Sequence, residues 1–446
     1  MRASTALLTD RYELTMIDAA LADGTADRAC VFEVFARRLP SGRRYGVVAG
    51  TGRLLEAIES FRFDGPALDW IAAEGIVSDR MLEYLREYTF RGDITGYAEG
   101  ELYFPGSPIL QASGTFADAV VLETLILSIL NYDSAVASAA SRMTQAAIGR
   151  PCLEMGSRRA HEDAAVAAAR AAVVAGFDGT SNLEAGRRYG LHTIGTAAHA
   201  FTLLHDTERD AFVAQVASAG AGTTLLVDTY DIEQGVITAV DVAGRALGAV
   251  RLDSGDLPVV AREVREQLDE LGASDTRIVV SSDLDEYAIA ALAAAPVDSY
   301  GVGTSVVTGS GFPTCGMVYK LVLREGEDGA MHAVAKKSSG GKASIGGRKA
   351  AGRRIENGLA TEEVVFLSPD DDVPVLDEAI AEVGQGELRA LQVPLVVAGR
   401  IDESYTGPAG VQRARERHAA SLDELPRAAR RLSAGDPAIP TEVITV

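Results

Sequence analysis

Residues 248–283 read GAVRLDSGDLPVVAREVREQLDELGASDTRIVVSSD, and this stretch contains one strand–helix–strand unit. The apolar run at 248–256 ends in an Asp-Ser-Gly-Asp turn. Apolar residues then recur at helical spacing over 257–272, where Gly272 stands at the position of a helix C-cap. A second apolar run follows at 277–283. This order predicts a βα unit in a parallel sheet.

The same alternation continues on both sides of this unit. Further short apolar runs that end in polar or glycine-rich clusters lie at 151–157, 192–199, 223–231 and 297–305. Helical patterns occupy 160–176 and 284–295. Spacings of about 20–30 residues per unit suit an α/β barrel. Because the unit at 177–192 is too short for a full helix, the expected barrel is irregular.

The two flanks of this central region have a different pattern. Residues 90–115 are interrupted by Gly and Pro, which predicts short antiparallel strands. Residues 317–350 also predict strands and turns. We therefore expect the flanks to form a second domain, or two, beside the barrel.

The composition excludes several classes of protein. With 446 residues and a net charge of −21, the chain lacks the basic balance of a nucleic-acid-binding domain. Its three cysteines are far apart and form no CxxC pair, which favours a reduced, cytoplasmic protein without disulfides or a zinc site. The most apolar stretch, 116–130, contains two acidic residues and is too short to span a bilayer, so no membrane association is expected.

Many charged and polar residues stand at the expected carboxyl ends of the strands. The residues there are Arg158, His199, Asp228, Arg251, Asp253, Asp283 and Thr304. In α/β barrels the reaction takes place at this end of the strands. Such a set exceeds what a barrel needs for stability and favours a functional site.

The motif VRLDSGDL places Arg251 and Asp253 on one face, because alternate residues of a strand point the same way. An arginine can bind phosphate with two hydrogen bonds. A neighbouring carboxylate can hold Mg²⁺ or ribose hydroxyls. An internal ion pair between the two residues is the structural alternative.

Two further motifs are suited to phosphate. In GVGTS (301–305), glycines let backbone N–H groups approach a phosphate, and Thr304 adds a hydroxyl, although a plain tight turn has the same sequence. In EMGSRRAH (154–161), Arg158 supplies positive charge, whereas for Arg159 we expect a surface cap or pair. Together with two acidic groups suited to Mg²⁺ and one histidine, these motifs favour a doubly phosphorylated sugar as substrate.

Five motifs in this order resemble the nicotinate phosphoribosyltransferase family: LLTDRYELTM (7–16), EMGSRRAH (154–161), GTAAHAF (195–201), GAVRLDSGDL (248–257) and VGTSVVT (302–308). The resemblance implies an irregular α/β barrel with an additional α/β sandwich domain built from N- and C-terminal segments. The implied domains are 1–115 and 316–446 for the sandwich and 116–315 for the barrel. It also implies a homodimer with shared active sites.

The family reaction joins nicotinate to 5-phosphoribosyl 1-pyrophosphate, giving nicotinate mononucleotide and pyrophosphate for NAD biosynthesis. ATP and water are consumed as co-substrates, ADP and phosphate are released, and Mg²⁺ takes part. By resemblance, His199 matches the histidine that ATP phosphorylates. Imidazole is a competent nucleophile at neutral pH.

The resemblance also assigns binding residues. Those implied for phosphoribosyl pyrophosphate are Arg158, Arg251, Asp253, Gly303 and Thr304, with Asp253 also a catalytic residue and the Mg²⁺ contact, directly or through water. Those implied for nicotinate are Tyr12, Ser181, Thr196 and Arg251, with Tyr12 reaching in from the partner subunit.

Two positions bear on the choice of pyridine substrate. Ser181 stands where nicotinamide-using relatives carry an aspartate, and a serine can donate a hydrogen bond to a carboxylate. This favours nicotinate over nicotinamide. Met155 stands where those relatives have a phenylalanine that stacks on the ring, and methionine orders a ring less.

Other functions remain as alternatives. Nicotinamide phosphoribosyltransferase is disfavoured by Ser181, and quinolinate phosphoribosyltransferase would need more cationic groups. A Schiff-base aldolase would need a lysine at a barrel strand end, and no lysine occurs before residue 320. A non-catalytic protein that binds phosphoribosyl metabolites is the remaining alternative.

Overall fold

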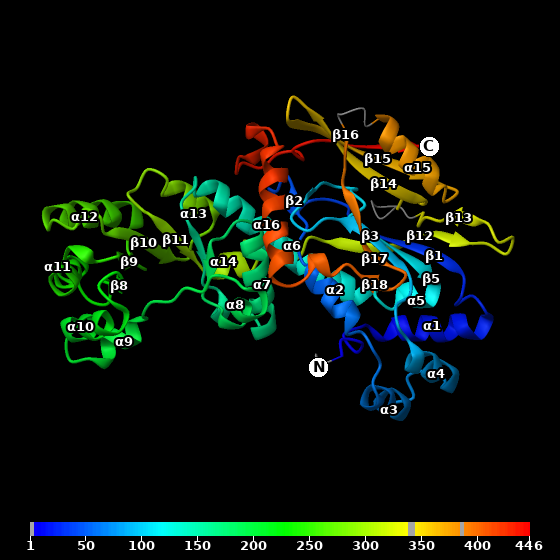
Figure 1. Ribbon diagram of the computed structural model, residues 1–446, viewed down its shortest axis with the longest axis horizontal. Helices are drawn as coiled ribbons and strands as arrows, with labels where there is room; N and C mark the ends of the chain where they lie inside the picture. The colour runs from blue at the N-terminus through cyan, green and yellow to red at the C-terminus, as the bar shows by residue number, and fades with distance from the viewer. Residues whose placement is uncertain (1–3, 338–343, 384–387) are drawn as a thin grey trace. The chain divides into compact units, whose positions relative to one another are not determined.

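The computed structural model describes residues 4–337, 344–383 and 388–446 (Figure 1). The chain divides into two compact units. The first unit combines residues 1–137 and 312–446, and the second contains residues 138–311. The chain passes from the first unit to the second within helix α6 (Glu123–Ala146).

The second unit contains the predicted parallel sheet. Its six strands in the described residues have the order β7-β6-β11-β10-β9-β8, and each neighbouring pair is parallel. These strands are β6 (Cys152–Glu154), β7 (Gly179–Thr180), β8 (Thr224–Leu226), β9 (Ala249–Leu252), β10 (Arg277–Ser282) and β11 (Ser299–Val302). The predicted α/β class is confirmed, and the sheet is a parallel half-barrel.

Helices connect the strands of this half-barrel. They are α7 (Glu162–Val174), α8 (Leu183–Tyr189), α9 (His199–Leu204), α10 (Glu208–Ala219), α11 (Ile232–Ala243), α12 (Leu257–Glu270), α13 (Glu286–Ala291) and α14 (Thr304–Val307). Short 3-10 turns lie at Ser157–Arg159 and Gly244–Ala246. The unit read from residues 248–283 is confirmed as β9, α12 and β10, and Gly272 follows the helix with a positive φ of 72°.

One expected strand is absent. Residues 192–198 form no named strand, and their only bridge in the described structure joins Thr193 to Thr180. The expectation of a strand here was wrong because Gly195, Thr196 and Ala198 are exposed and leave little side chain to bury. The segment instead runs along the end of the sheet and leads directly into α9.

The first unit joins both ends of the chain in one sheet. Its largest sheet has the order β13-β12-β1-β5-β3-β17-β18 among the described residues. Strand β1 pairs antiparallel with β12 and β5, so Val34 lies opposite both Tyr319 and Leu110. In Figure 1 the blue and cyan N-terminal strands of this sheet lie between yellow C-terminal strands on one side and orange ones on the other. The expected contribution of both flanks to one α/β domain is confirmed.

The strands of the first unit also form a four-stranded sheet, β16-β14-β15-β19, and a pair, β2-β4, in the part of the chain that is described. Their bounds are β1 (Ala29–Ala36), β2 (Gly46–Val47), β3 (Asp93–Tyr97), β4 (Leu102–Tyr103), β5 (Leu110–Thr115), β12 (Met317–Glu325), β13 (Met331–Ala333), β14 (Arg348–Glu356), β15 (Leu359–Ser368), β16 (Leu388–Ala390), β17 (Gln392–Val397), β18 (Arg400–Ile401) and β19 (Thr441–Thr445). The helices are α1 (Arg11–Asp23), α2 (Thr51–Glu59), α3 (Gly65–Ala73), α4 (Asp79–Glu87), α5 (Phe116–Val120), α15 (Val373–Val383) and α16 (Gly407–Asp423), with short 3-10 turns at Glu403–Tyr405 and Arg427–Arg430.

The segment 116–137 belongs to the first unit by its contacts, although the sequence grouped it with the barrel. Leu122, Leu125 and Ile126 from this segment are buried in the apolar core of the first unit. The domain boundaries expected at residues 116 and 316 stay a prediction.

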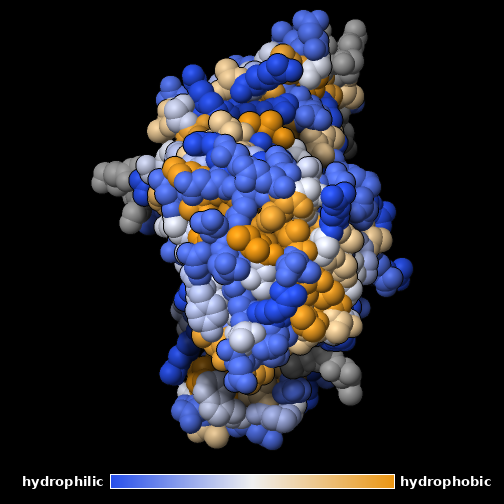
Figure 2. Space-filling model, turned by 90° about the vertical axis from the view of Figure 1, so that its left-hand side faces the viewer, coloured by the Kyte–Doolittle hydropathy of each residue, from blue (hydrophilic) through white to orange (hydrophobic). Residues whose placement is uncertain are grey.

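One helical segment of the described chain, residues 116–146, is long and apolar enough to cross a membrane by length and composition alone. This helical segment is longer than the apolar stretch at 116–130 because α5 and α6 follow one another. However, 67% of its most apolar part is buried within the protein, as in the core helices of globular proteins. On the face shown in Figure 2, hydrophilic residues predominate and apolar residues gather in separate patches.

Candidate active site

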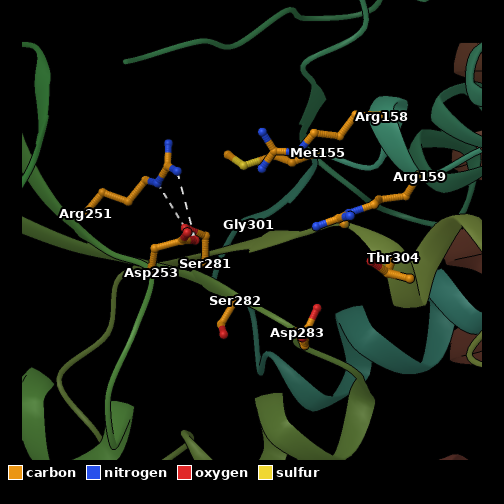
Figure 3. Close-up of a pocket in the computed structure, with 11 residues that line it drawn as sticks. Met155, Arg158, Arg159, Arg251, Asp253, Ser281, Ser282, Asp283, Gly301 and Thr304 are labelled. Atoms are coloured by element: carbon orange, nitrogen blue, oxygen red, sulfur yellow. Dashed lines mark hydrogen bonds and ion pairs between the residues drawn. The ribbon is translucent and has the colours of Figure 1, made fainter. Parts of the chain in front are cut away.

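A polar cavity of about 250 Å³ opens at the carboxyl ends of the strands of the second unit. Its walls come from the turns after β6, β9, β10 and β11, because the carboxyl ends of parallel strands meet at one edge. Figure 3 shows the guanidinium groups of Arg158, Arg159 and Arg251 directed into the same space. Asp253 lies beside Arg251, and Asp283 lines the cavity directly after β10. The cavity therefore concentrates positive charge in an acidic protein.

Arg251 and Asp253 share one face of β9, as predicted, and a serine joins them. The Nε of Arg251 donates to the hydroxyl of Ser281 at 2.9 Å, and that hydroxyl donates to Oδ1 of Asp253 at 2.7 Å. The direct distance from Nη2 of Arg251 to Oδ1 of Asp253 is 4.0 Å. The two residues are thus held in place without forming a tight ion pair, and the charge of Arg251 stays available to a ligand.

A second cavity of about 300 Å³ adjoins the first, since Met155, Arg158 and Arg251 line both. Its other walls are formed by Ser157, Ser181 and the segment 194–198. The apolar side chains of this cavity suit a flat ring, and its few polar groups can orient the ring. The exposed segment 194–198 therefore serves as a cavity wall.

Thr196 connects this wall to the first cavity. Its hydroxyl accepts a hydrogen bond from Nη1 of Arg251 at 3.1 Å. Arg251 thus contacts Ser281 near the end of β10 and both Thr196 and Ala197 in the segment before α9. A single guanidinium group reaches both cavities.

His199 is the first residue of α9 and lies beside two carboxylates. Its Nδ1 is 3.0 Å from the hydroxyl of Thr229, and its Nε2 is 3.9 Å from Oδ1 of Asp228 and 3.9 Å from Oδ2 of Asp253. The imidazole side chain is 40% exposed. It is therefore fixed on one side and accessible to a reactant.

Asp228 holds in place the turn after β9 that carries Asp253. Its side chain is 1% exposed, and Oδ2 accepts from the backbone N–H of Asp253 and the hydroxyl of Ser254, both at 2.8 Å. Within the described residues, Oδ1 has no hydrogen-bond partner. A buried carboxylate oxygen without a donor is costly, which indicates that this oxygen meets a further group during function.

The acidic residues suit Mg²⁺ that arrives with a phosphorylated substrate. No group of three or more His, Cys, Asp or Glu side chains in the described chain could hold a metal by itself. Mg²⁺ is usually bound through one or two carboxylates together with substrate phosphates. Asp253, with the free Oδ1 of Asp228 behind it, supplies such oxygens beside the cationic cavity.

The structure brings most of the predicted site residues together. Those that line the first cavity are Arg158, Arg251, Asp253, Gly303 and Thr304. Ser181 and Thr196 line the second cavity. Tyr12 lies in the first unit, on α1, and its side chain is exposed. Partial burial, with the nearby charge of Glu123, raises the pKa of Tyr12 to about 12. Its contribution to a partner's site stays a prediction.

Three residues of the first cavity were missed by sequence reasoning. Arg159 was expected on the surface, but the 3-10 turn at Ser157–Arg159 directs it into the cavity beside Arg158. Ser281 and Ser282 also line it, and their position at a strand end was the signal that could have identified them.

Comparison with known proteins assigns the family. The family model for the nicotinate phosphoribosyltransferase N-terminal domain matches residues 7–131. The chain is 57% identical over 447 residues to nicotinate phosphoribosyltransferase pncB1 of Mycobacterium tuberculosis, covering 98% of this chain and 95% of that protein. The chain is an enzyme of the nicotinate phosphoribosyltransferase family.

More distant members agree with this assignment. Nicotinate phosphoribosyltransferase of Bacillus subtilis is 39% identical over 379 residues, covering 83% of this chain and 77% of that protein. The crystal structure of human nicotinic acid phosphoribosyltransferase superposes with a TM-score of 0.80 at 25% identity, covering 98% of this chain and 97% of that chain. The family resemblance read from the five motifs is confirmed.

Proposed function

We propose that this chain transfers the phosphoribosyl group of 5-phosphoribosyl 1-pyrophosphate to the ring nitrogen of nicotinate. The bond from C1 of ribose to the pyrophosphate oxygen breaks, and a bond from C1 to the pyridine nitrogen forms. The observation that carries this proposal is the pair of adjoining cavities, one cationic and one apolar, which share Arg158 and Arg251. The names of the relatives supply nicotinate and the phosphoribosyl group, and the resemblance of the five motifs supplies the pyrophosphate donor.

The cationic cavity would bind the phosphates. Arg158, Arg159 and Arg251 face the pyrophosphate, and the backbone of Gly303 and Thr304 at the start of α14 faces the 5′-phosphate. Positive groups fixed in advance stabilise the negative charge that develops on the departing pyrophosphate. When bound, Mg²⁺ would neutralise phosphate charge, and Asp253 would hold it with Asp228.

The apolar cavity would bind nicotinate. Ser181 donates to the carboxylate of the ring, and Arg251, hydrogen-bonded to Thr196, supplies a positive charge nearby. An amide substrate would gain nothing from that charge. This arrangement supports nicotinate rather than nicotinamide as the substrate.

His199 would take the γ-phosphoryl group of ATP. With the proton on Nδ1, that nitrogen would donate to Thr229, and the lone pair of Nε2 would be free to attack. The Nε2–P bond forms while the bond between the γ-phosphorus and the bridging oxygen breaks, and ADP leaves. Asp228 and Asp253 stabilise the positive charge on the ring. Water later hydrolyses the phosphohistidine, and phosphate is released.

The proposal includes a cytoplasmic homodimer in which Tyr12 of each chain stacks on the nicotinate bound by the other. Its support is the family resemblance of the LLTDRYELTM motif, together with the exposure of Tyr12 on α1. Sedimentation of the purified chain would test the dimer, and formation of nicotinate mononucleotide by Tyr12→Ala would test the shared site.

The function is tested by incubating the purified chain with nicotinate, phosphoribosyl pyrophosphate and Mg²⁺, with and without ATP, and measuring nicotinate mononucleotide. Nicotinamide is supplied in parallel. We expect product from nicotinate, more with ATP than without. Product from nicotinamide alone would contradict the role of Ser181. No product from either substrate would favour a binding protein without transferase activity.

A further inference from the structure

Glu154 is a buried carboxylate directly beneath the two cavities. It is the last residue of β6 and is fully buried. Oε1 accepts a hydrogen bond from the backbone N–H of Gly156 at 2.5 Å, and Oε2 accepts from the hydroxyl of Thr180 at 2.5 Å. In the described part of the chain no basic side chain forms an ion pair with it. Burial accordingly raises the pKa of Glu154.

The partners of Glu154 belong to two turns that carry proposed ligand-binding groups. Gly156 precedes the 3-10 turn that bears Arg158, and Thr180 precedes Ser181. The backbone N–H of Ser181 donates to the carbonyl oxygen of Glu154 at 2.8 Å. One residue therefore holds the turn after β6 and the turn after β7 through both its side chain and its backbone.

A direct bond also joins these two turns. The hydroxyl of Thr180 accepts from the backbone N–H of Asn182 at 2.9 Å. The side-chain amide of Asn182 donates to the hydroxyl of Ser157 at 3.0 Å. The carboxylate of Glu154 thus belongs to a set of hydrogen bonds that links the turn after β6 to the turn after β7.

Gly156 brings the third turn into this arrangement. A Cβ atom at Gly156 would lie 2.3 Å from Cγ1 of Val307 and 2.8 Å from the carbonyl oxygen of Gly303. The turn after β6 therefore rests directly on the turn that carries Gly303 and Thr304. The hydrogen bond from Gly156 to Glu154 fixes this close contact.

We propose that Glu154 is a positioning residue that sets the spacing between the carboxylate-binding group Ser181 and the phosphate-binding groups Arg158 and Gly303. Glu154 is not among the residues that line either cavity, and it acts through the turns it holds. The inference rests on the proposed function, because the spacing matters only if nicotinate and phosphoribosyl pyrophosphate bind in the two cavities.

The test compares KM and kcat for both substrates in Glu154→Ala, Glu154→Gln and Thr180→Val. Glutamine keeps an oxygen for the N–H of Gly156, and its side-chain N–H can donate to the hydroxyl oxygen of Thr180. Both partners therefore stay in contact, although the direction of the second hydrogen bond is reversed. Asp298→Ala is the matched control, because Asp298 accepts from the backbone N–H of Ile278 near the opposite end of the same sheet. Melting temperatures are recorded for all variants.

We expect Glu154→Ala to raise KM for nicotinate about tenfold or more, with a smaller loss in kcat, because two buried donors lose their acceptor and the turns shift. Glu154→Gln should stay within about threefold of the wild type, and Thr180→Val should resemble Glu154→Ala. Asp298→Ala should leave both KM values unchanged. If Glu154→Ala fails to fold, Thr180→Val decides the comparison.

Unchanged KM values in Glu154→Ala and Thr180→Val, with lower melting temperatures only, would overturn the inference and leave Glu154 a purely structural residue. Glu154→Gln as damaging as Glu154→Ala would also overturn it, since the charge and not the hydrogen bonds would then matter. Failure of the wild type to use nicotinate would instead refute the proposed function, and the two failures are distinguishable.

Discussion

The two units of this protein use charged residues in opposite ways. In the first unit, Arg353 is fully buried and contacts Glu101 at 2.7 Å and Glu363 at 2.9 Å. In the second unit, Asp253 is 32% exposed, and it lies 3.9 Å from His199 and 4.0 Å from Arg251. The carboxylates of the first set are paired with arginines of the same unit. The second set is held loosely apart and keeps its charges for a ligand.

The protonation of Glu101 follows from the first arrangement. Burial alone would raise the pKa of Glu101, but Arg353 and Arg389 hold it at about 2. The carboxylate therefore stays charged at any pH at which the protein would work. This network joins strands that are far apart in sequence, and its residues are not among those that line the two cavities.

The largest effect on stability should come from breaking the buried network. Arg353→Ala removes the cation that contacts Glu363 and one of the arginines that contact Glu101, although Arg389 stays 2.8 Å from Glu101. This change should cost about 3–5 kcal/mol in the free energy of unfolding. Arg354→Ala is the control, because Arg354 forms a partly exposed pair with Glu362 and should cost about 1 kcal/mol or less. Urea unfolding measures both. Equal losses in the two variants would remove the distinction between buried and exposed charges in this unit.

The largest effect on activity should come from the loosely held set. Arg251→Ala should lower kcat/KM for nicotinate about 10²–10³-fold, because the same guanidinium group lines both cavities. Its melting temperature should change little, since Arg251 forms no tight ion pair. Arg262→Ala, an exposed position on α12, is the control and should be neutral in both assays. A stability loss in Arg251→Ala that accounted for its inactivity would contradict the comparison.

Acid should destabilise the first unit through His418. Burial, together with Arg415, lowers the pKa of His418 to about 4, below the unfolded value of 6.5. Between these values the unfolded chain binds a proton that the folded chain does not. The free energy of unfolding should therefore fall by up to about 3 kcal/mol as pH drops from 6.5 to 4.

The measurement is urea unfolding between pH 4 and pH 7 for the wild type and for His418→Gln. The variant should lose most of this pH dependence. His332→Gln serves as the control, because His332 is exposed and pairs with Asp328 on the surface. An identical pH slope in the wild type and in His418→Gln would show that His418 does not titrate as its burial predicts.

The smallest effect concerns specificity within the second cavity. Ser181→Asp should reduce kcat/KM for nicotinate about tenfold or more, because the new carboxylate would repel that of the substrate. Ser181→Ala removes only the donor and should cost less. Competition between nicotinate and nicotinamide measures the change. Unaltered preference in Ser181→Asp would place the substrate carboxylate elsewhere.

Patterns within a short stretch of sequence predicted those elements of the fold that residues close in sequence determine. The unit β9, α12 and β10 was readable because apolar spacing, the turn and Gly272 agree within one short stretch. The prediction of a strand at residues 192–198 was wrong because a short apolar run does not reveal whether its small side chains become buried. The ion pair of Glu101 and Arg353 was unpredictable, since 252 residues separate its members along the chain.

The sequence predicted the candidate site about as well as it predicted the fold. Residues at the carboxyl ends of strands or just after them, such as Arg251, Asp253 and Thr304, meet because the carboxyl ends of parallel strands share one edge. The direction of a side chain in a short turn cannot be read from sequence, so Arg159 was assigned to the surface. Glu154 was overlooked because its role depends on contacts among three separate turns.

The most direct test of the claim that the loosely held charges of the second unit carry the chemistry is phosphorylation of His199. The protein is incubated with ATP labelled at the γ-phosphate, and acid-labile label on the chain is measured in the wild type, His199→Ala and Arg354→Ala. The account predicts label on the wild type and on Arg354→Ala, and none on His199→Ala. Label that persists in His199→Ala, or a wild type that makes nicotinate mononucleotide without ever becoming labelled, would contradict it.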